Sequence, residues 1–269
     1  MIAPSERIGA AIQAAVATGR PALVGYLTAG FPNRRQFKKD LAAVAGGCDV
    51  VEVGVPFTDP MADGATVQRA SFAALADGVT LPWILDEIKS LEPKPAVPIL
   101  LMSYLNPLLA FGLQQLPRAA ALSGVAGFIV PDLPFEESGD LHAALEAEGL
   151  ALIQMVTPVT PAERLAVLCR QAKGFVYAVT MTGTTGKSAD GKFAEVPLEV
   201  LDYMDRVKRL SNVPVCAGFG IRSARQVARF APHVDGVVVG SALVETLEKG
   251  EDVSAFLKSL RPATTQGAP

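Results

Sequence analysis

Short, almost continuous apolar runs alternate with segments of helical periodicity along the 269 residues of the chain. Strands that are apolar on both faces belong to a parallel sheet covered by helices, and helical segments between them supply the crossovers. Eight such repeats in this length predict a (β/α)8 TIM barrel rather than an open doubly wound sheet. The runs are Ala22–Thr28, Val50–Val55, Pro98–Tyr104, Gly127–Asp132, Ala151–Thr157, Phe175–Thr180, Pro214–Phe219 and Gly236–Gly240.

Helical patterns follow most of these runs. Several end near a glycine, which tolerates the left-handed conformation of a helix cap. No Pro/Ser-rich linker divides the chain, so we expect one domain over residues 1–269, with a frayed tail at 262–269. The patterned segments are Arg34–Ala45, Leu81–Leu91, Glu136–Glu148, Pro161–Ala172, Val200–Leu210, Ser223–Phe230 and Ala242–Leu260.

The N-terminal stretch from Ile8 to Thr18 is apolar enough to suggest the core of a signal peptide. Gln13 interrupts it, however, and Glu6 replaces the usual positive lead. We therefore expect an extra amphipathic helix there, capped by the hydroxyl of Ser5. No apolar run long enough to span a membrane follows, so no membrane association is expected.

Charge and cysteine content limit the partners and the compartment. The formal net charge is −3, whereas nucleic-acid backbones are bound by clustered Lys and Arg, so nucleic acid is not an expected partner. Cys48, Cys169 and Cys216 are odd in number and lack disulfide or CxxC spacing. This pattern favours a reducing cytoplasm.

A carboxylate interrupts one of the apolar strands. Glu52 shares a strand face with Gly54, while the flanking valines share the other face and are expected to meet the helices. Glu52 then points into the barrel mouth, where desolvation raises a carboxyl pKa toward the range useful for acid–base catalysis. The alternative is a buried carboxylate satisfied by a neighbouring hydroxyl or Arg. Asp63 precedes a helix expected near Thr66, and its position fits a catalytic, a turn or an N-cap role.

Two glycine-rich clusters follow later strands. The Thr182–Ser188 segment superficially resembles a Walker A loop, but Met181 occupies the position of the leading glycine of that motif. The segment is better interpreted as a lid. Gly218–Gly220 and Gly240–Ser241 follow the seventh and eighth strands, where this fold usually binds phosphate through backbone N–H groups. Ordinary tight turns are the alternative. His142 and His233 lack metal-ligand spacing, and no metal site is expected.

The thirteen residues from Glu52 to Gly64 closely resemble the signature of tryptophan synthase α subunits. Further segments resemble the same family in the expected order: Tyr26–Pro32, Leu101–Pro107, Val130–Pro134 and Gly218–Ile221. The resemblance implies a TIM-barrel carbon–carbon lyase that splits indole-3-glycerol phosphate into indole and glyceraldehyde 3-phosphate in tryptophan biosynthesis. It implies no metal and no cofactor bound to this chain.

The same resemblance assigns roles to individual residues. Glu52 becomes the principal acid–base residue and Asp63 the second catalytic carboxylate. The residues expected around the indole are Tyr26, Leu101, Tyr177 and Phe219. Those expected to hold the phosphate are Gly186, Gly220, Gly240 and Ser241. Asp59 and Thr185 match residues that pair between two loops and couple lid closure to assembly of the site.

The sequence departs from the family pattern in the lid. Thr184 stands where the family usually has Val, and the segment Lys187–Pro197 is a few residues longer than expected. The closed form of this loop therefore follows less directly from the resemblance than the chemistry does.

The resemblance also implies a partner, the pyridoxal-phosphate β subunit, in an α2β2 heterotetramer. We expect it to dock around the barrel mouth, near Asp59, Asn106 and Asp132. Other phosphosugar barrels, such as an indole-glycerol-phosphate synthase, commonly need a strand-borne Lys, which the predicted strands lack. Two alternatives stay open: a stand-alone indole-3-glycerol-phosphate lyase, and a non-catalytic regulatory subunit that binds a phosphate ligand.

Overall fold

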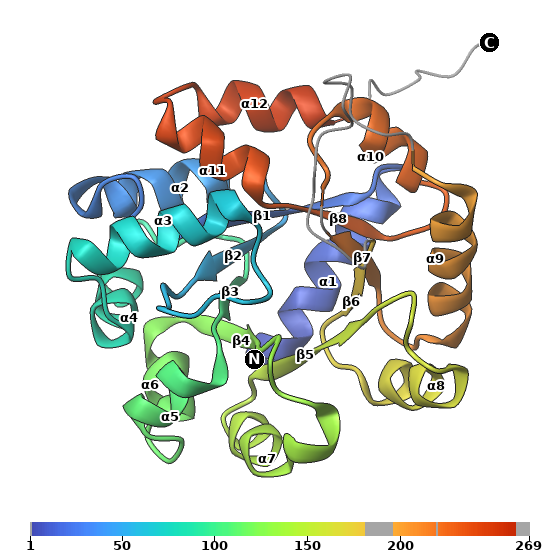
Figure 1. The fold of residues 1–269 in the computed structure, drawn as a ribbon, viewed down its shortest axis with the longest axis horizontal. Helices are drawn as coiled ribbons and strands as arrows, with labels where there is room; N and C mark the ends of the chain where they lie inside the picture. The colour runs from blue at the N-terminus through green and yellow to red at the C-terminus, as the bar shows by residue number, and fades with distance from the viewer. Residues whose placement is uncertain (1, 181–195, 219, 262–269) are drawn as a thin grey trace.

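The computed structural model describes residues 2–180, 196–218 and 220–261. In this part of the chain, eight parallel strands close into a barrel in which β8 pairs with β1 (Figure 1). The predicted (β/α)8 barrel is therefore confirmed. The strands are β1 (Ala22–Thr28), β2 (Val50–Gly54), β3 (Ile99–Met102), β4 (Val125–Ile129), β5 (Ala151–Val156), β6 (Val176–Val179), β7 (Val215–Gly218) and β8 (Gly236–Val239).

Helices surround the barrel, and two short 3-10 turns, η1 (Arg34–Gln36) and η2 (Phe135–Glu137), precede two of them. The helices are α1 (Pro4–Ala17), α2 (Phe37–Gly47), α3 (Ala65–Ala76), α4 (Leu81–Lys89), α5 (Leu105–Phe111), α6 (Leu116–Ser123), α7 (Gly139–Ala147), α8 (Ala162–Gln171), α9 (Leu198–Leu210), α10 (Ala224–Phe230), α11 (Ser241–Glu248) and α12 (Val253–Leu260).

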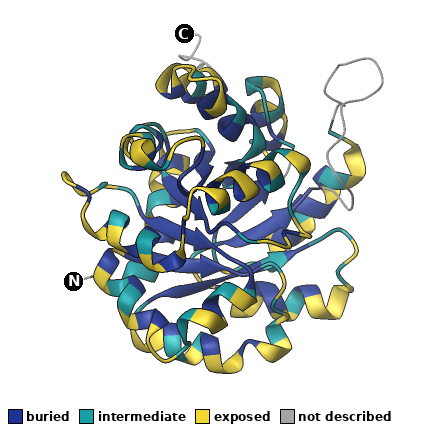
Figure 2. Ribbon diagram, turned by 60° about the vertical axis from the view of Figure 1, so that its left-hand side comes forward, coloured by how far each residue is buried: buried dark blue, intermediate teal, exposed yellow. Residues whose placement is uncertain are grey.

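Buried apolar side chains of the described residues form two clusters, one between barrel and helices and one inside the barrel. Alternation along a strand sends neighbouring residues to opposite clusters. In β2, Val51 and Val53 join the outer cluster, whereas Val50 joins the inner one. The strands are buried along nearly their whole length, while the helices expose one face to solvent (Figure 2). Glu52 is therefore directed into the barrel, as its sequence context predicts.

Helix α1 lies against the barrel, and its apolar face packs into the inner cluster through Ile8 and Ile12 (Figure 1). The extra N-terminal helix is thus confirmed, but the predicted Ser5 cap is wrong. The N-cap residue is Ala3, and Ser5 lies inside the first turn. The carboxylate of Glu6 accepts a hydrogen bond from the backbone N–H of Ala3 at 3.1 Å, so the N-cap N–H gains its partner from Glu6 and not from Ser5.

Some predicted boundaries differ from those observed. The fourth strand begins at Val125, two residues before the predicted start at Gly127, and ends at Ile129. The helix predicted from Ala242 to Leu260 is two helices, because the carboxylate of Asp252 starts α12 by accepting the N–H of Ala255 at 3.0 Å. The single-domain assignment with a frayed tail stays a prediction, since residues 262–269 lie outside the described part.

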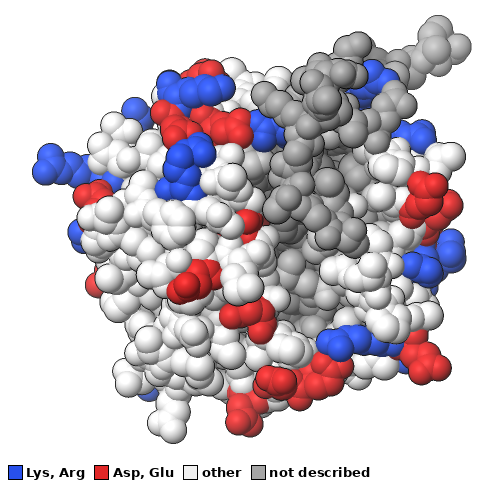
Figure 3. Space-filling view, viewed as in Figure 1, with Lys and Arg blue, Asp and Glu red and all other residues white. Residues whose placement is uncertain are grey.

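Among the described helices, none is both long enough and apolar enough to cross a lipid bilayer. On the face seen in Figure 3, acidic and basic side chains lie interspersed over the described surface instead of gathering into one basic patch. Strand C-termini and the loops that follow them meet at one end of the barrel, which is where this fold builds its sites.

Candidate active site

A cavity opens at the C-terminal ends of the strands, and residues from six of the eight strand–helix units line it. It contains both predicted carboxylates and three of the predicted phosphate-binding residues. Its lining consists of Tyr26, Glu52, Asp63, Gly64, Val67, Met102, Tyr177, Gly220, Val238, Gly240 and Ser241. The residues that sequence reasoning placed at one site are therefore brought together from distant parts of the chain.

Glu52 reaches this cavity from the middle of β2 and is only 1% exposed. Its Oε2 atom has no hydrogen-bond partner among the described residues, which argues against a carboxylate satisfied by a neighbouring hydroxyl or Arg. Burial, and secondarily the nearby charge of Asp63, raise the pKa of Glu52 to about 8. The group is therefore protonated at neutral pH and able to donate a proton.

Asp63 faces the same cavity from the loop between β2 and α3. It is not the N-cap of α3, because that position is taken by Gly64. Burial raises the pKa of Asp63 to about 6, and a hydrogen bond from Tyr104 opposes this shift. At neutral pH Asp63 is therefore ionised while Glu52 is protonated, which gives the two carboxyl groups different chemical roles.

Tyr104 is a site residue that sequence reasoning did not single out. Its hydroxyl donates to Oδ2 of Asp63 at 3.2 Å and accepts the backbone N–H of Ala62 at 2.8 Å. Its ring stacks on Phe57, with ring centroids 5.1 Å apart. One feature of the sequence could have indicated its role, because Tyr104 lies two residues after the end of β3, at the barrel rim.

Two of the four residues predicted around an indole ring line the cavity, namely Tyr26 and Tyr177. The assignment of Leu101 is wrong, because its side chain belongs to the outer cluster between strands and helices. Its neighbour Met102 alternates to the inner face and lines the cavity in its place. Phe219 lies outside the described residues.

The turns after β7 and β8 line the same cavity through Gly220, Gly240 and Ser241. Gly220 adopts φ of 78°, in the left-handed region that favours glycine, and so can present backbone to a ligand. Gly240 is the N-cap of α11, and Ser241 is its first residue. First-turn N–H groups of a helix have no acceptor within the helix and attract anions. Gly186, the fourth predicted phosphate ligand, lies outside the described residues.

The predicted pairing between loops is not described, because Thr185 lies outside the described residues. Asp59 is exposed on the β2–α3 loop, and its own backbone carbonyl accepts the N–H of Met61 at 2.8 Å. Among the described residues, no group of three His, Cys, Asp or Glu side chains is arranged to hold a metal ion. His142 and His233 lie away from the cavity, and His233 pairs with Asp205 at 2.8 Å.

Comparison with known proteins agrees with this geometry. The family described as "Tryptophan synthase alpha chain" matches residues 12–265. The tryptophan synthase alpha chain of Solidesulfovibrio magneticus is 45% identical over 251 residues, which cover 93% of this chain and 96% of the relative. That of Geobacter sulfurreducens is 41% identical over 251 residues, with 91% and 93% covered.

Solved structures give the same result. A crystal structure of tryptophan synthase from M. tuberculosis, in its aminoacrylate-bound form, matches with a TM-score of 0.83 and 34% identity, covering 95% of this chain and 98% of that chain. The tryptophan synthase subunit alpha of Legionella pneumophila str. Paris matches with a TM-score of 0.82 and 31% identity, covering 95% and 97%. The chain therefore belongs to the tryptophan synthase alpha chain family.

Proposed function

We propose that this chain cleaves indole-3-glycerol phosphate into indole and glyceraldehyde 3-phosphate by a retro-aldol reaction, as a carbon–carbon lyase of tryptophan biosynthesis. The observation that carries the proposal is the buried Glu52 carboxyl, whose Oε2 atom has no hydrogen-bond partner among the described residues, in a cavity that also holds Asp63 and the glycine turns after β7 and β8. A substrate with a ring at one end and a phosphate at the other matches this distribution of groups.

Glu52 supports the first proton transfer. Breaking the bond between indole C3 and the side chain requires a proton on C3, so that the ring leaves as neutral indole and not as a carbanion. A glutamic acid whose pKa is about 8 carries this proton at neutral pH. Donation leaves Glu52 as a carboxylate inside the cavity.

Asp63 supports the charged intermediate. Protonation at C3 places positive charge on the ring nitrogen, and an ionised carboxylate can accept the N1–H hydrogen bond and stabilise that charge. The hydroxyl of Tyr104 holds one oxygen of Asp63, which favours its ionised form and fixes its direction.

The ionised Glu52 then removes the hydroxyl proton on the adjacent side-chain carbon. The O–H electrons form the aldehyde carbonyl, the C–C bond breaks, and its electron pair returns to the ring to neutralise the charged nitrogen. Glu52 ends protonated, as it began. These transfers use two carboxyl groups of the chain, so the proposed reaction assigns no step to a cofactor here.

The phosphate is held by backbone N–H groups of Gly220, Gly240 and Ser241, and Gly186 completes the proposed set. Tyr26, Tyr177 and Phe219 are the proposed walls of the ring pocket, and Asp59 and Thr185 the proposed loop pair. The arrangement fixes the substrate by its distant phosphate and places C3 near Glu52, which is how remote binding contributes to a reaction rate.

Supplying the purified chain with indole-3-glycerol phosphate and following indole release tests the proposal. We expect catalytic release of equimolar indole and glyceraldehyde 3-phosphate. A folded chain that releases no indole, alone or with a tryptophan synthase β subunit, would overturn the assigned activity. Binding without turnover would favour the alternative, a non-catalytic regulatory subunit.

The second part of the proposal is a β-subunit partner that carries pyridoxal phosphate and forms an α2β2 complex with this chain in the cytoplasm. Apolar side chains are exposed on elements around the mouth, with Met61 90%, Val159 74% and Leu109 49% exposed. A partner that docks at this end of the barrel would bury these side chains, and their removal from water would favour the contact. The N–H of Leu105 donates to Asp132 at 2.9 Å, which joins two of the segments expected at this interface.

Size-exclusion chromatography with and without the β partner tests this docking, and failure to co-elute would remove it. Turnover separates the partner-dependent enzyme from a stand-alone lyase, since both would share every catalytic residue. Strong stimulation of indole release by the β subunit supports the synthase, whereas brisk release by the isolated chain supports the stand-alone enzyme.

A further inference from the structure

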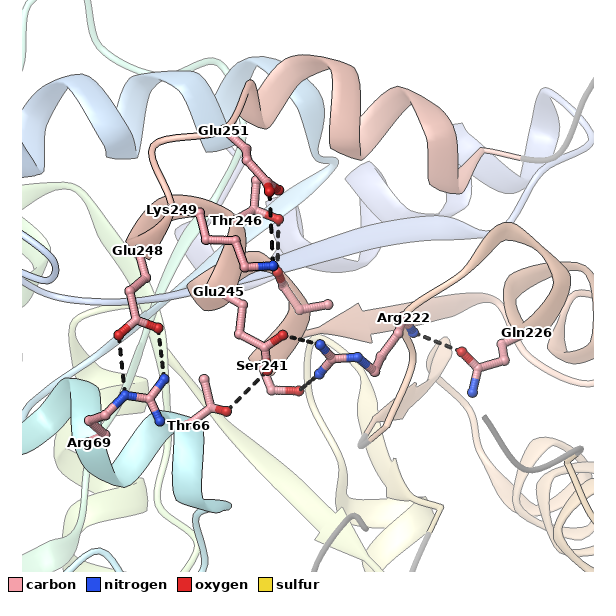
Figure 4. A network of polar contacts seen from close by, with 11 residues as sticks. Thr66, Arg69, Arg222, Gln226, Ser241, Glu245, Thr246, Glu248, Lys249 and Glu251 are labelled. Atoms are coloured by element: carbon pink, nitrogen blue, oxygen red, sulfur yellow. Dashed lines mark hydrogen bonds and ion pairs between the residues drawn. The ribbon is translucent and has the colours of Figure 1, made fainter. Parts of the chain in front are cut away.

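A polar network connects the phosphate end of the cavity to the loop that carries Asp63. It begins at Arg222, two residues after Gly220 in the loop between β7 and α10. The guanidinium donates from Nη1 to the hydroxyl of Ser241 at 3.0 Å, and its Nη2 forms an ion pair with Glu245 (Figure 4). Arg222 thus contacts the first turn of α11 from a neighbouring loop.

The network continues from α11 to α3. Oε1 of Glu245 accepts a hydrogen bond from the hydroxyl of Thr66 at 3.2 Å, and Thr66 follows Asp63 by three residues (Figure 4). Two residues further along α3, Nε2 of Gln68 donates to the backbone carbonyls of Asp63 at 2.9 Å and Pro60 at 3.3 Å. The position of α3 therefore sets the position of the catalytic loop.

The other end of the network is fixed as well. The side-chain oxygen of Gln226 accepts the backbone N–H of Arg222 at 2.9 Å, and its Nε2 donates to the carbonyl of Gly220 at 3.1 Å. The turn that contains Gly220 and the backbone of Arg222 is therefore held by one side chain from α10.

We propose that Arg222 and Glu245 form a brace that fixes the phosphate-binding turns relative to α3, which makes Arg222 a positioning residue for the phosphate and for Asp63. The phosphate ester as ligand rests on the proposed function. The two side chains are 21% and 27% exposed, so solvent screens their pairing less than it screens a surface pair. Charge-assisted bonds from a planar guanidinium are strong and directional, which suits a brace.

The chain offers a matched control pair. Arg69 and Glu248 join the same two helices through a bidentate contact, with Nε–Oε1 at 3.2 Å and Nη2–Oε2 at 2.7 Å (Figure 4). Their side chains are 52% and 36% exposed, and neither residue lines the cavity. This pair links α3 to α11 but does not contact the phosphate-binding turns. Its removal therefore shows what the loss of an ion pair between these helices does by itself.

The first experiment measures the dissociation constant of glycerol 3-phosphate from the stabilisation that it gives against unfolding. We expect Arg222→Gln to weaken binding roughly five- to tenfold, since the charge-assisted bonds that fix the phosphate-binding turns are lost. We expect Arg69→Gln to bind as the parent does. Glu245→Gln removes the charged partner that holds Arg222, so binding is expected to weaken in the same direction as in Arg222→Gln, by a smaller factor because the amide oxygen can still accept a hydrogen bond.

Weaker binding in both Arg222→Gln and Glu245→Gln, with parent-like binding in Arg69→Gln, supports the brace. Tighter binding in Glu245→Gln would contradict the brace, since it would mean that Arg222 acts on the anion directly as a charge. Equal affinities in parent, Arg222→Gln and Arg69→Gln would overturn it. If Arg222→Gln does not fold, Arg222→Lys replaces it. A lysine keeps the charge but cannot hold Ser241 and Glu245 in the same geometry, so weakened binding is still expected and parent-like binding contradicts the brace.

The second experiment concerns the connection to Asp63. Thr66→Val keeps the shape of the side chain and removes its hydrogen bond to Glu245, so kcat for indole release is expected to fall roughly threefold or more with glycerol 3-phosphate affinity unchanged. A parent-like kcat would remove this half of the brace. If the parent released no indole, the proposed function would fail, while the phosphate measurements would still decide the role of Arg222.

Discussion

The hydroxyl of Tyr104 donates a hydrogen bond to Oδ2 of Asp63 across 3.2 Å, and this bond opposes the effect of burial on the carboxylate. The two residues come from different strand–helix units and meet only at the barrel mouth. The bond keeps Asp63 ionised and aimed at the cavity, which is the state that a developing positive charge on the ring requires.

Replacing Tyr104 with Phe is expected to raise the pKa of Asp63 further and to lower kcat for indole release roughly tenfold, since a hydrogen bond to a charged group is lost. Tyr203→Phe is the control, because the hydroxyl of Tyr203 is buried without a partner among the described residues. That variant is expected to be fully active. Equal kcat values and equal acid limbs of the pH profile in Tyr104→Phe and the parent would remove the role assigned to Tyr104.

A bell-shaped pH profile is expected for kcat/KM. Glu52 with a pKa of about 8 must be protonated, and Asp63 with a pKa of about 6 must be ionised. Activity therefore falls as pH rises through the upper value and as pH falls through the lower one, and these apparent values belong to the coupled pair.

The alkaline limb is the diagnostic one, because the substrate phosphate also titrates near about 6. In Asp63→Asn, the charge that raises the pKa of Glu52 is gone, so the alkaline limb of the residual activity is expected to move to lower pH. A limb that stays in place would mean that the two carboxyl groups do not interact.

Stability is expected to depend on pH through Glu52. In the unfolded chain this group loses its proton near its ordinary pKa of 4.5, whereas in the folded protein it keeps the proton up to about 8. The folded state binds more protons in this window, so the free energy of unfolding of the parent falls as pH rises through it. Glu52→Gln has no titrating group at this position, so its free energy of unfolding should not fall in this way. The difference in stability between the variant and the parent is therefore expected to shift in favour of the variant as pH rises.

Chemical denaturation of parent and Glu52→Gln across this pH range measures the difference. Asp40→Asn is a useful comparison, because burial raises the pKa of Asp40 from 3.8 to about 6. The stability that this variant gains over the parent should therefore reach its full value at a lower pH than in Glu52→Gln. A stability difference between Glu52→Gln and the parent that does not change with pH would contradict a buried, protonated Glu52.

Gly54→Ala is expected to damage the ring pocket. A Cβ atom at Gly54 would lie 2.2 Å from the hydroxyl oxygen and 2.6 Å from Cζ of Tyr26, so the tyrosine ring must move into the cavity. We expect about 1–3 kcal/mol of destabilisation and a raised KM. Gly46→Ala is the control, since a Cβ there meets no atom within 4 Å. Parent-like KM in Gly54→Ala would show that Tyr26 does not shape the pocket.

Strand alternation and barrel topology were predictable because they depend on local pattern. The apolar run around Glu52 indicated both a strand and the face that carries the carboxylate, and the fold then indicated the end of the barrel where it acts. The assignment of Leu101 was wrong for a related reason. The sequence pattern located the strand but did not show which of two adjacent apolar residues faces inward, whereas pairing with Val53 of β2 does.

Contacts between distant segments could not be predicted from pattern. Nothing near Tyr104 in the sequence shows that its hydroxyl meets Asp63, forty-one positions earlier. Arg222 likewise stands among ordinary loop residues, and its contacts with Ser241 and Glu245 follow from the way β7 and β8 lie side by side. Such pairs depend on the closed barrel, which brings loops from distant parts of the chain to the same end.

The central claim is that Glu52 transfers the proton that releases indole, and a comparison of indole release by the parent and by Glu52→Gln tests it most directly. Glutamine preserves the size of the side chain and removes the titrating group. We expect a fall in kcat of at least about a hundredfold, with glycerol 3-phosphate still bound as tightly as by the parent. A variant that releases indole as fast as the parent would contradict it.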